Sequence, residues 1–341
     1  MKISKRVRRG YALVLACMLA LPCLAMMQTQ AADAVEVDRK CSLTVSVEGN
    51  YDKAFEEDLS EMQVPVSLYR VASVDAVGRF TGIDAWSSMK FDSISSTTTA
   101  EDWADFAEEA YGLAGDQKPY AEENIGKTDG GLASARFTDL NTGMYLVVPQ
   151  AAFNTDYSYE YTFTPYLTAL PGNVYAQTGT GDDSWDYDPV IGLKAEREQQ
   201  EGALNIQKTL ATYNETLGPV TCVFQVEAVN EGGDVVYSNV VSATLEGADA
   251  AETVRLTGIP AGARVTVTEI YAGGSYRVVG SDTVETVIVS NTDPANADGQ
   301  LDAAVSFTNE YSGGNRGGYG VTNHFSQDED GLWDWTTDVQ E

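Results

Sequence analysis

The sequence predicts an all-β protein made of two tandem immunoglobulin-like β-sandwich domains, the first of which carries a helical insertion. Three observations predict this fold class. Short segments rich in Val, Thr, Tyr and Phe alternate apolar and polar residues, and Gly, Asn and Asp turns separate them. The 341 residues are enough for about two domains. A polar stretch at 195–202 interrupts the strand pattern and marks the boundary between the two domains.

The first element along the chain is a signal peptide, predicted for residues 1–31. A basic stretch from Met1 to Arg9 precedes an apolar run from Tyr11 to about Met27, and small residues follow. Cleavage is expected after Ala31 or Ala34. The mature chain contains no second apolar run of about 20 residues, so no membrane span is predicted in it. We therefore expect a secreted or surface-exposed protein.

The first domain is predicted for residues 35–195. Its candidate strands are Cys41–Val47, Val64–Ala72, Gly143–Val148 and Tyr161–Leu167. One helix interrupts them. Thr99 is a candidate N-cap, and apolar residues then recur at helical spacing, namely Trp103, Phe106, Ala107, Ala110 and Tyr111. We expect this helix to be an insertion that covers one sheet of the domain.

The second domain is predicted for residues 203–311, a length typical of an immunoglobulin-like sandwich. Its candidate strands are Leu204–Leu210, Thr221–Val229, Val235–Val241, Arg264–Tyr271 and Ala304–Tyr311. The sequence Glu231-Gly232-Gly233-Asp234 is suited to a hairpin turn between two of them. Beyond Tyr311 the Gly-rich sequence predicts a flexible acidic tail over 312–341.

Composition excludes several classes of function. The chain has 51 Asp and Glu against 21 Lys and Arg, and five of those basic residues lie in the first ten positions, so the remainder carries a net charge of about −35. Such a surface repels nucleic acid and anionic lipid. His324 is the only histidine, which argues against His-based triads and most zinc hydrolases. No enzyme with turnover, no cofactor and no metal site is predicted, and the acidic clusters are interpreted as solvated turns.

Three strands of the second domain each place one polar residue on the apolar face. Side chains two apart share a face of a strand, so Lys208 lies on the side of Leu204, Ile206 and Leu210. The same alternation turns Glu269 inward with Val265 and Val267, and Asn309 inward with Val305 and Phe307. An unpaired buried charge costs several kcal/mol, so we expect the three side chains to meet in the interior.

An amine, a carboxylic acid and a carboxamide in one dry core can react. Burial disfavours charge, so Lys208 and Glu269 can both be neutral, and a neutral amine is a nucleophile. Glu269 is expected to hydrogen-bond to the carboxamide oxygen of Asn309 and to relay the proton that expels ammonia. The product is an amide cross-link. The alternative is a buried Lys–Glu ion pair beside a hydrogen-bonded asparagine.

These residues resemble the isopeptide-bonded pilin and surface-adhesin domains of Gram-positive bacteria, of the collagen-adhesin B type and its streptococcal major-pilin relatives. The resemblance rests on Ile206-Gln207-Lys208, on Gly258-Ile259-Pro260-Ala261-Gly262 leading into Val267-Thr268-Glu269, and on Phe307-Thr308-Asn309. It implies a spontaneous isopeptide bond between Lys208 and Asn309 with Glu269 as the catalytic acid. It also implies a structural or adhesive subunit of the cell wall or pilus.

The first domain resembles the amino-terminal domains of the same pilins through Val66–Ala72, Gly143–Val148 and Tyr161–Leu167. No isopeptide bond is predicted there, because Cys41, Leu43, Val45 and Val47 point inward on its first strand and no lysine does.

The family implies sortase-mediated assembly with other pilus subunits. The segment from Trp185 to Lys194 keeps the spacing of the family's Trp-led motif but has Gly192-Leu193 where the family has Tyr-Pro. Lys194 is the candidate linkage residue, and the alternative is an ordinary solvated lysine. No Leu-Pro-x-Thr-Gly sorting signal follows Tyr311, which leaves polymerisation open.

The alternative function is a free secreted module that binds a host glycan or matrix protein. Its candidate contact surface is a group of tyrosines, namely Tyr157, Tyr159, Tyr161 and Tyr166, for which edge-strand packing is the ordinary role. Cys41 and Cys222 fall on inward strand faces and are interpreted as buried, inert thiols.

Overall fold

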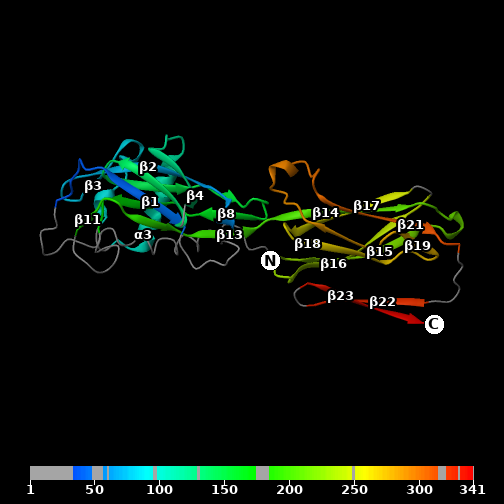
Figure 1. The fold of residues 1–341 in the computed structure, drawn as a ribbon. Helices are drawn as coiled ribbons and strands as arrows, with labels where there is room; N and C mark the ends of the chain where they lie inside the picture. Colours follow the sequence, from blue (N-terminus) through cyan, green and yellow to red (C-terminus); the bar gives the residue numbers. More distant parts are fainter. Residues whose placement is uncertain are drawn as a thin grey trace. The chain divides into compact units, whose positions relative to one another are not determined.

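The computed structural model describes residues 34–47, 57–59, 61–94, 98–128, 131–173, 184–247, 250–313, 320–328 and 331–340; the predicted signal peptide lies outside them. Strands dominate the described chain (Figure 1), which confirms the all-β class. The chain divides into two compact units, Met1–Thr155 with Tyr161–Arg197, and Asp156–Glu160 with Glu198–Glu341. We call them unit 1 and unit 2. None of the helices in the described residues has the length and apolar character needed to cross a bilayer.

Unit 1 contains one hydrogen-bonded path of strands in which β4 joins the two halves. In spatial order the path is β12 (Val190–Leu193), β1 (Cys41–Val47), β5 (Gly131–Leu140), β4 (Ala121–Thr128), β2 (Val64–Val74), β6 (Gly143–Pro149) and β9 (Tyr166–Leu170), and β3 (Phe80–Gly82) pairs with β2. The strand β12 runs parallel to β1 and the other pairs are antiparallel. Unit 1 also has the shorter strands β7 (Ala152–Phe153), β10 (Gly172–Asn173) and β11 (Trp185–Asp186). The residues of β8 (Tyr159–Phe163) and β13 (Ala195–Gln199) are divided between the two units.

The predicted helix is α3 (Ala100–Ala114), and Thr99 is its N-cap. The Thr99 side chain accepts a hydrogen bond from the backbone of Asp102, whose carboxylate accepts one from the backbone of Thr99. This reciprocal pair satisfies two donors that the first turn of a helix leaves free. The helix buries its apolar face against β6 and β9. Tyr111, predicted on that face, is instead 51% exposed, because it lies at the edge of the apolar stripe.

Unit 2 is a sandwich of two four-stranded sheets. One sheet has the order β17 (Ala251–Pro260), β14 (Glu201–Leu210), β21 (Ala303–Tyr311) and β19 (Tyr276–Val279). The other has the order β16 (Val235–Leu245), β15 (Val220–Val229), β18 (Arg264–Tyr271) and β20 (Thr283–Val287). The inward residues of both sheets form one apolar core, and the rings of Phe224 and Phe307 meet across it with their centres 5.1 Å apart.

The hairpin between β15 and β16 has the turn that the sequence predicts. The backbone N–H of Asn230 donates to the carbonyl of Asp234 at 3.0 Å. Gly233 has a backbone φ of 84°, a conformation that residues with a Cβ atom rarely adopt. The glycine therefore closes the hairpin and holds the β15–β16 register from Val220↔Leu245 to Val229↔Val235.

Two strand predictions differ from the structure. The segment predicted as one strand, Tyr161–Leu167, is divided between β8 and β9, because Pro165 between them has no backbone N–H to donate to a ladder. The polar stretch 195–202, predicted to interrupt the strands, is itself extended: it contains β13 and the start of β14. Most of β13 is exposed, so the strand carries no apolar alternation that could reveal it.

The predicted flexible tail also differs from the structure. Its described residues form an antiparallel hairpin of β22 (Gly320–Gln327) and β23 (Trp333–Gln340). The hairpin is held to the outer face of unit 2, where the Ser238 hydroxyl donates to the carbonyl of Trp333 at 2.9 Å and the Trp335 indole donates to Gln225. Trp333 and Trp335 are half-buried, and this partial burial of apolar surface favours the hairpin over a flexible linker.

Candidate functional site

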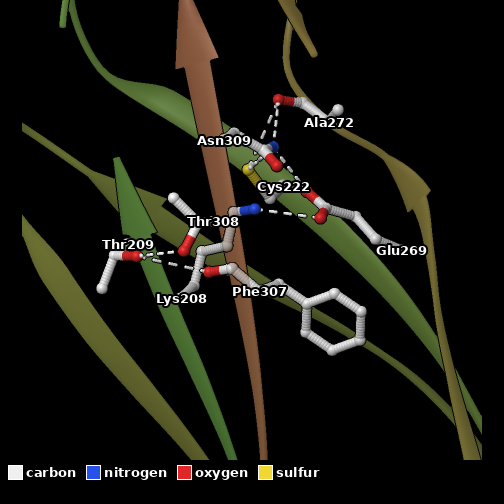
Figure 2. Close-up of polar contacts among 8 residues, drawn as sticks. All are labelled: Lys208, Thr209, Cys222, Glu269, Ala272, Phe307, Thr308 and Asn309. Carbon is white, nitrogen blue, oxygen red and sulfur yellow. Dashed lines mark hydrogen bonds and ion pairs between the residues drawn. The ribbon is translucent and has the colours of Figure 1, made fainter. Parts of the chain in front are cut away.

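Lys208, Glu269 and Asn309 lie together in the core of unit 2 (Figure 2). Lys208 is on β14 and Asn309 is on β21, which run side by side in parallel with Lys208 opposite Phe307 and Leu210 opposite Asn309. Glu269 comes from β18 in the facing sheet. Lys208 and Asn309 are 0% exposed and Glu269 is 6% exposed, which agrees with the inward orientation predicted from strand alternation.

Glu269 contacts both nitrogens of the group. The Lys208 Nζ donates to Glu269 Oε2 at 2.9 Å, and the Asn309 Nδ2 donates to Glu269 Oε1 at 2.6 Å. Each carboxyl oxygen therefore serves a different nitrogen. The contacts fit the alternative as well, because a buried Lys208–Glu269 ion pair is present beside a hydrogen-bonded Asn309. They also place the amine, the carboxyl group and the carboxamide within reach of one another.

The orientation of the Asn309 carboxamide differs from the one we expected. The sequence predicts that Glu269 bonds to the amide oxygen, but it bonds to Nδ2. The backbone carbonyl of Ala272 explains the difference, because it accepts from Nδ2 at 2.9 Å and a carbonyl can only accept. The Oδ1 of Asn309 is buried and has no hydrogen-bond partner among the described residues. Ala272 thus directs the nitrogen, not the oxygen, toward the acid.

The surroundings favour a neutral amine at Lys208. Burial lowers the pKa of Lys208 below its usual value, and the hydrogen bond and charge of Glu269 oppose that shift. Phe224 lies below the amine, with its ring centre 6.0 Å from Nζ. Transfer of one proton along the 2.9 Å contact from Nζ to Oε2 converts the ion pair into a neutral amine and a neutral acid. In this dry environment the neutral amine is a competent nucleophile.

Cys222 and Ala272 belong to the same group of contacts, a role that was not predicted from the sequence. The Cys222 Sγ accepts from Asn309 Nδ2 and donates to the Ala272 carbonyl, both at 3.6 Å. Burial raises the pKa of Cys222 to about 12, so the group is a thiol rather than a thiolate. Its inward place next to Phe224 was visible in the alternation of β15, but a backbone carbonyl such as that of Ala272 has no residue-type signal.

The other predicted residues lie apart from this group. Lys194 follows β12 in unit 1 and is exposed. The other lysines of unit 1 whose side chains are described, Lys40, Lys90 and Lys118, are exposed as well. The inward side chains of β1 are Cys41, Leu43, Val45 and Val47, and all are buried.

The tyrosines proposed as a contact surface do not form one exposed patch. Tyr161 is fully buried and donates to Asp58, while Tyr157, Tyr159 and Tyr166 are half-buried. One of the acidic clusters interpreted as solvated turns contains Asp182 and Asp183, which lie outside the described residues. In the described part of the chain no three His, Cys, Asp or Glu side chains are grouped so as to hold a metal ion.

A family model matches the part of the chain that contains the site. Residues 204–312, which include Lys208, Glu269 and Asn309, match a family described as a domain of unknown function (DUF5979). No curated protein sequence matches the chain.

Similar solved structures include pilins and adhesins of Gram-positive bacteria. The Bacillus anthracis TIE protein is 13% identical with a TM-score of 0.30; the alignment covers 89% of this chain and 42% of that one, so this chain spans less than half the length of TIE. The minor pilin GBS52 of Streptococcus agalactiae is 13% identical over 80% of this chain and 96% of its own, with a TM-score of 0.23. The major pilin SpaD of Corynebacterium diphtheriae is 11% identical over 84% of this chain and 100% of its own, with a TM-score of 0.28.

Proposed function

We propose that this protein is a structural and adhesive pilin-type subunit of the cell surface, and that unit 2 is locked by an autocatalytic isopeptide bond between Lys208 and Asn309. The observation that carries the proposal is the bridging contact of Glu269. One of its oxygens faces the amine that must lose a proton, and the other faces the nitrogen that must gain one. This is the arrangement that a bifunctional acid–base catalyst requires.

The reaction balances with the three side chains alone. The neutral Nζ of Lys208 attacks the carboxamide carbon of Asn309, so a bond forms between Nζ and that carbon. Glu269 takes one proton from Nζ through Oε2 and gives one proton to Nδ2 through Oε1. The bond between the carbon and Nδ2 then breaks, and ammonia leaves. Glu269 is again the neutral acid that the first proton transfer from Lys208 produced, and each molecule reacts once.

The position of the bond suits a load-bearing subunit. It joins β14, the first strand of the sandwich, to β21, the last, and these strands are already parallel neighbours. Tension applied to the two ends of unit 2 would pass through the bond and bypass the residues between 208 and 309. A surface subunit that connects a cell to a substrate experiences such tension.

The bond predicts a mass defect. The intact mass of the purified protein is expected to lie about 17 Da below the sequence mass, the mass of one ammonia molecule lost in the reaction. Lys208→Ala and Asn309→Ala should each restore the sequence mass, because each removes one reacting group. Lys194→Ala is the matched control, since it removes an exposed lysine and should keep the defect. A wild-type protein with the full sequence mass would exclude the bond.

The subunit role predicts a covalent polymer. Immunoblotting of an enzymatic cell-wall digest is expected to show a ladder of high-mass species, and Lys194→Arg should abolish the ladder if Lys194 is the linkage lysine. Lys118→Arg, another exposed lysine of unit 1, is the control and should leave the ladder intact. A single band in the culture medium would instead indicate a free secreted module that binds a ligand, and would contradict the subunit role without affecting the bond.

A further inference from the structure

The thiol of Cys222 contacts the reacting carboxamide, although the proposed reaction gives it no chemical step. β15 turns Cys222 inward, where it is 0% exposed and its sulfur contacts both Asn309 and the Ala272 carbonyl (Figure 2). Its Sγ lies 3.6 Å from Asn309 Nδ2 and 3.6 Å from the Ala272 oxygen. The sulfur therefore lies on the nitrogen side of the carboxamide, while Oδ1 on the other side has no hydrogen-bond partner in the described chain.

The thiol is unsuited to act as a nucleophile or a base. A thiol that stays protonated attacks carbonyl carbon poorly, and burial keeps Cys222 in that form. What it can do is accept weakly from an N–H group and donate weakly from its S–H group. Both contacts are made here: it accepts from Nδ2 and donates to the carbonyl that Nδ2 also contacts.

These contacts distinguish the two orientations of the carboxamide. With Nδ2 toward Ala272, the two N–H donors of the amide are shared among three acceptors, namely Glu269, the Ala272 carbonyl and the Cys222 sulfur. If the amide were rotated by half a turn, Oδ1 would face the lone pairs of the Ala272 carbonyl, and the leaving nitrogen would point away from the acid. The cost of burying an acceptor against an acceptor disfavours that orientation.

We propose that Cys222 is a positioning residue which, with the Ala272 carbonyl, holds the leaving nitrogen of Asn309 against Glu269. This inference rests on the proposed isopeptide bond. On this inference, Cys222 raises the rate of ammonia loss through its weakly polar sulfur. It forms no bond to the reacting groups and transfers no proton. The competing explanation is that Cys222 only fills space in the core, as a small apolar residue does.

Three substitutions separate the two explanations. Cys222→Ser keeps a side chain that can accept and donate, Cys222→Val keeps the volume without polarity, and Cys222→Ala has neither. If Cys222 acts through its polarity, Cys222→Ser should react fastest of the three variants. If Cys222 only fills space in the core, Cys222→Val should react fastest. Val226→Ala is the matched control, because it alters the same buried, inward face of β15 one step of the alternation beyond Phe224.

The rate can be followed in the full chain by pulse labelling, a stop of translation, and intact-mass spectra taken during the chase. We expect Cys222→Ser to lose ammonia within about threefold of the wild-type rate, and Cys222→Val and Cys222→Ala to be about five- to tenfold slower. Circular dichroism and hydrogen exchange identify variants that have not folded, and the comparison of Ser with Ala remains decisive if Val fails to fold. Equal rates for Ser and Ala, or a faster rate for Val, would overturn the inference. A wild-type chain that never loses ammonia would overturn the proposed bond itself.

Discussion

Glu269→Gln is expected to fold without the cross-link and to unfold at a far lower temperature than the wild type. Glutamine has nearly the shape of glutamate but cannot take a proton from Lys208 and give one to Asn309, so the reaction should stop before ammonia leaves. The proposed bond would close a loop of 101 residues, the difference between 309 and 208. Its loss should lower the free energy of unfolding by about 4 to 5 kcal/mol if the entropy model for disulfides applies.

Glu269→Ala should be less stable still. It removes the cross-link and also leaves the amine of Lys208, which is 0% exposed, without its partner. Breaking a buried pair in this way costs about 3 to 5 kcal/mol. Thermal unfolding and intact mass should be measured together on both variants. Glu227→Gln, which neutralises an exposed carboxylate on β15, is the control and should keep both the mass defect and the stability. A mass defect in Glu269→Gln would show that Glu269 is not the proton carrier.

The second large effect is expected under force. When the protein is stretched by its two ends, the wild type should show no extension from residues 209–308, because the bond carries the load past them. Lys208→Met keeps an unbranched side chain but has no amine, so its unit 2 should unfold. The released loop of 101 residues corresponds to a gain in contour length of about 350 Å.

Single-molecule stretching of the whole chain provides its own control. Unit 1, in which no isopeptide bond is predicted, should give the same unfolding step in wild type and in Lys208→Met. The variant should add one further step, from unit 2. If wild-type molecules that have lost ammonia also show the long step, the bond does not lie on the load path between the ends of unit 2.

The elements that were predicted correctly have their signals in neighbouring residues, and those that were missed depend on residues distant in sequence or have no apolar pattern. The helix α3 was predicted because Thr99 and the apolar spacing after it are local signals. The exposed strand β13 was not predicted, because a strand without a buried face has no alternation of apolar and polar residues. The hairpin of β22 and β23 was missed because its anchoring partners, Gln225 and Ser238, lie about a hundred residues earlier in the chain.

In the candidate site, too, the local signals were predictable and the contacts between distant residues were not. Alternation along single strands was sufficient to identify Lys208, Glu269 and Asn309 as polar residues of an apolar face, since the period of two is a local property of the backbone.

Amino-acid order alone thus determined that this chain is built from strands and that Lys208, Glu269 and Asn309 enter the core of unit 2. Only the tertiary structure decided which atoms of those side chains face one another. The carbonyl of Ala272 and the sulfur of Cys222 orient the carboxamide of Asn309, and both reach it from strands or turns distant in sequence. Hydrogen-bond direction depends on the positions of neighbouring donors and acceptors in space, and packing of the two sheets sets those positions.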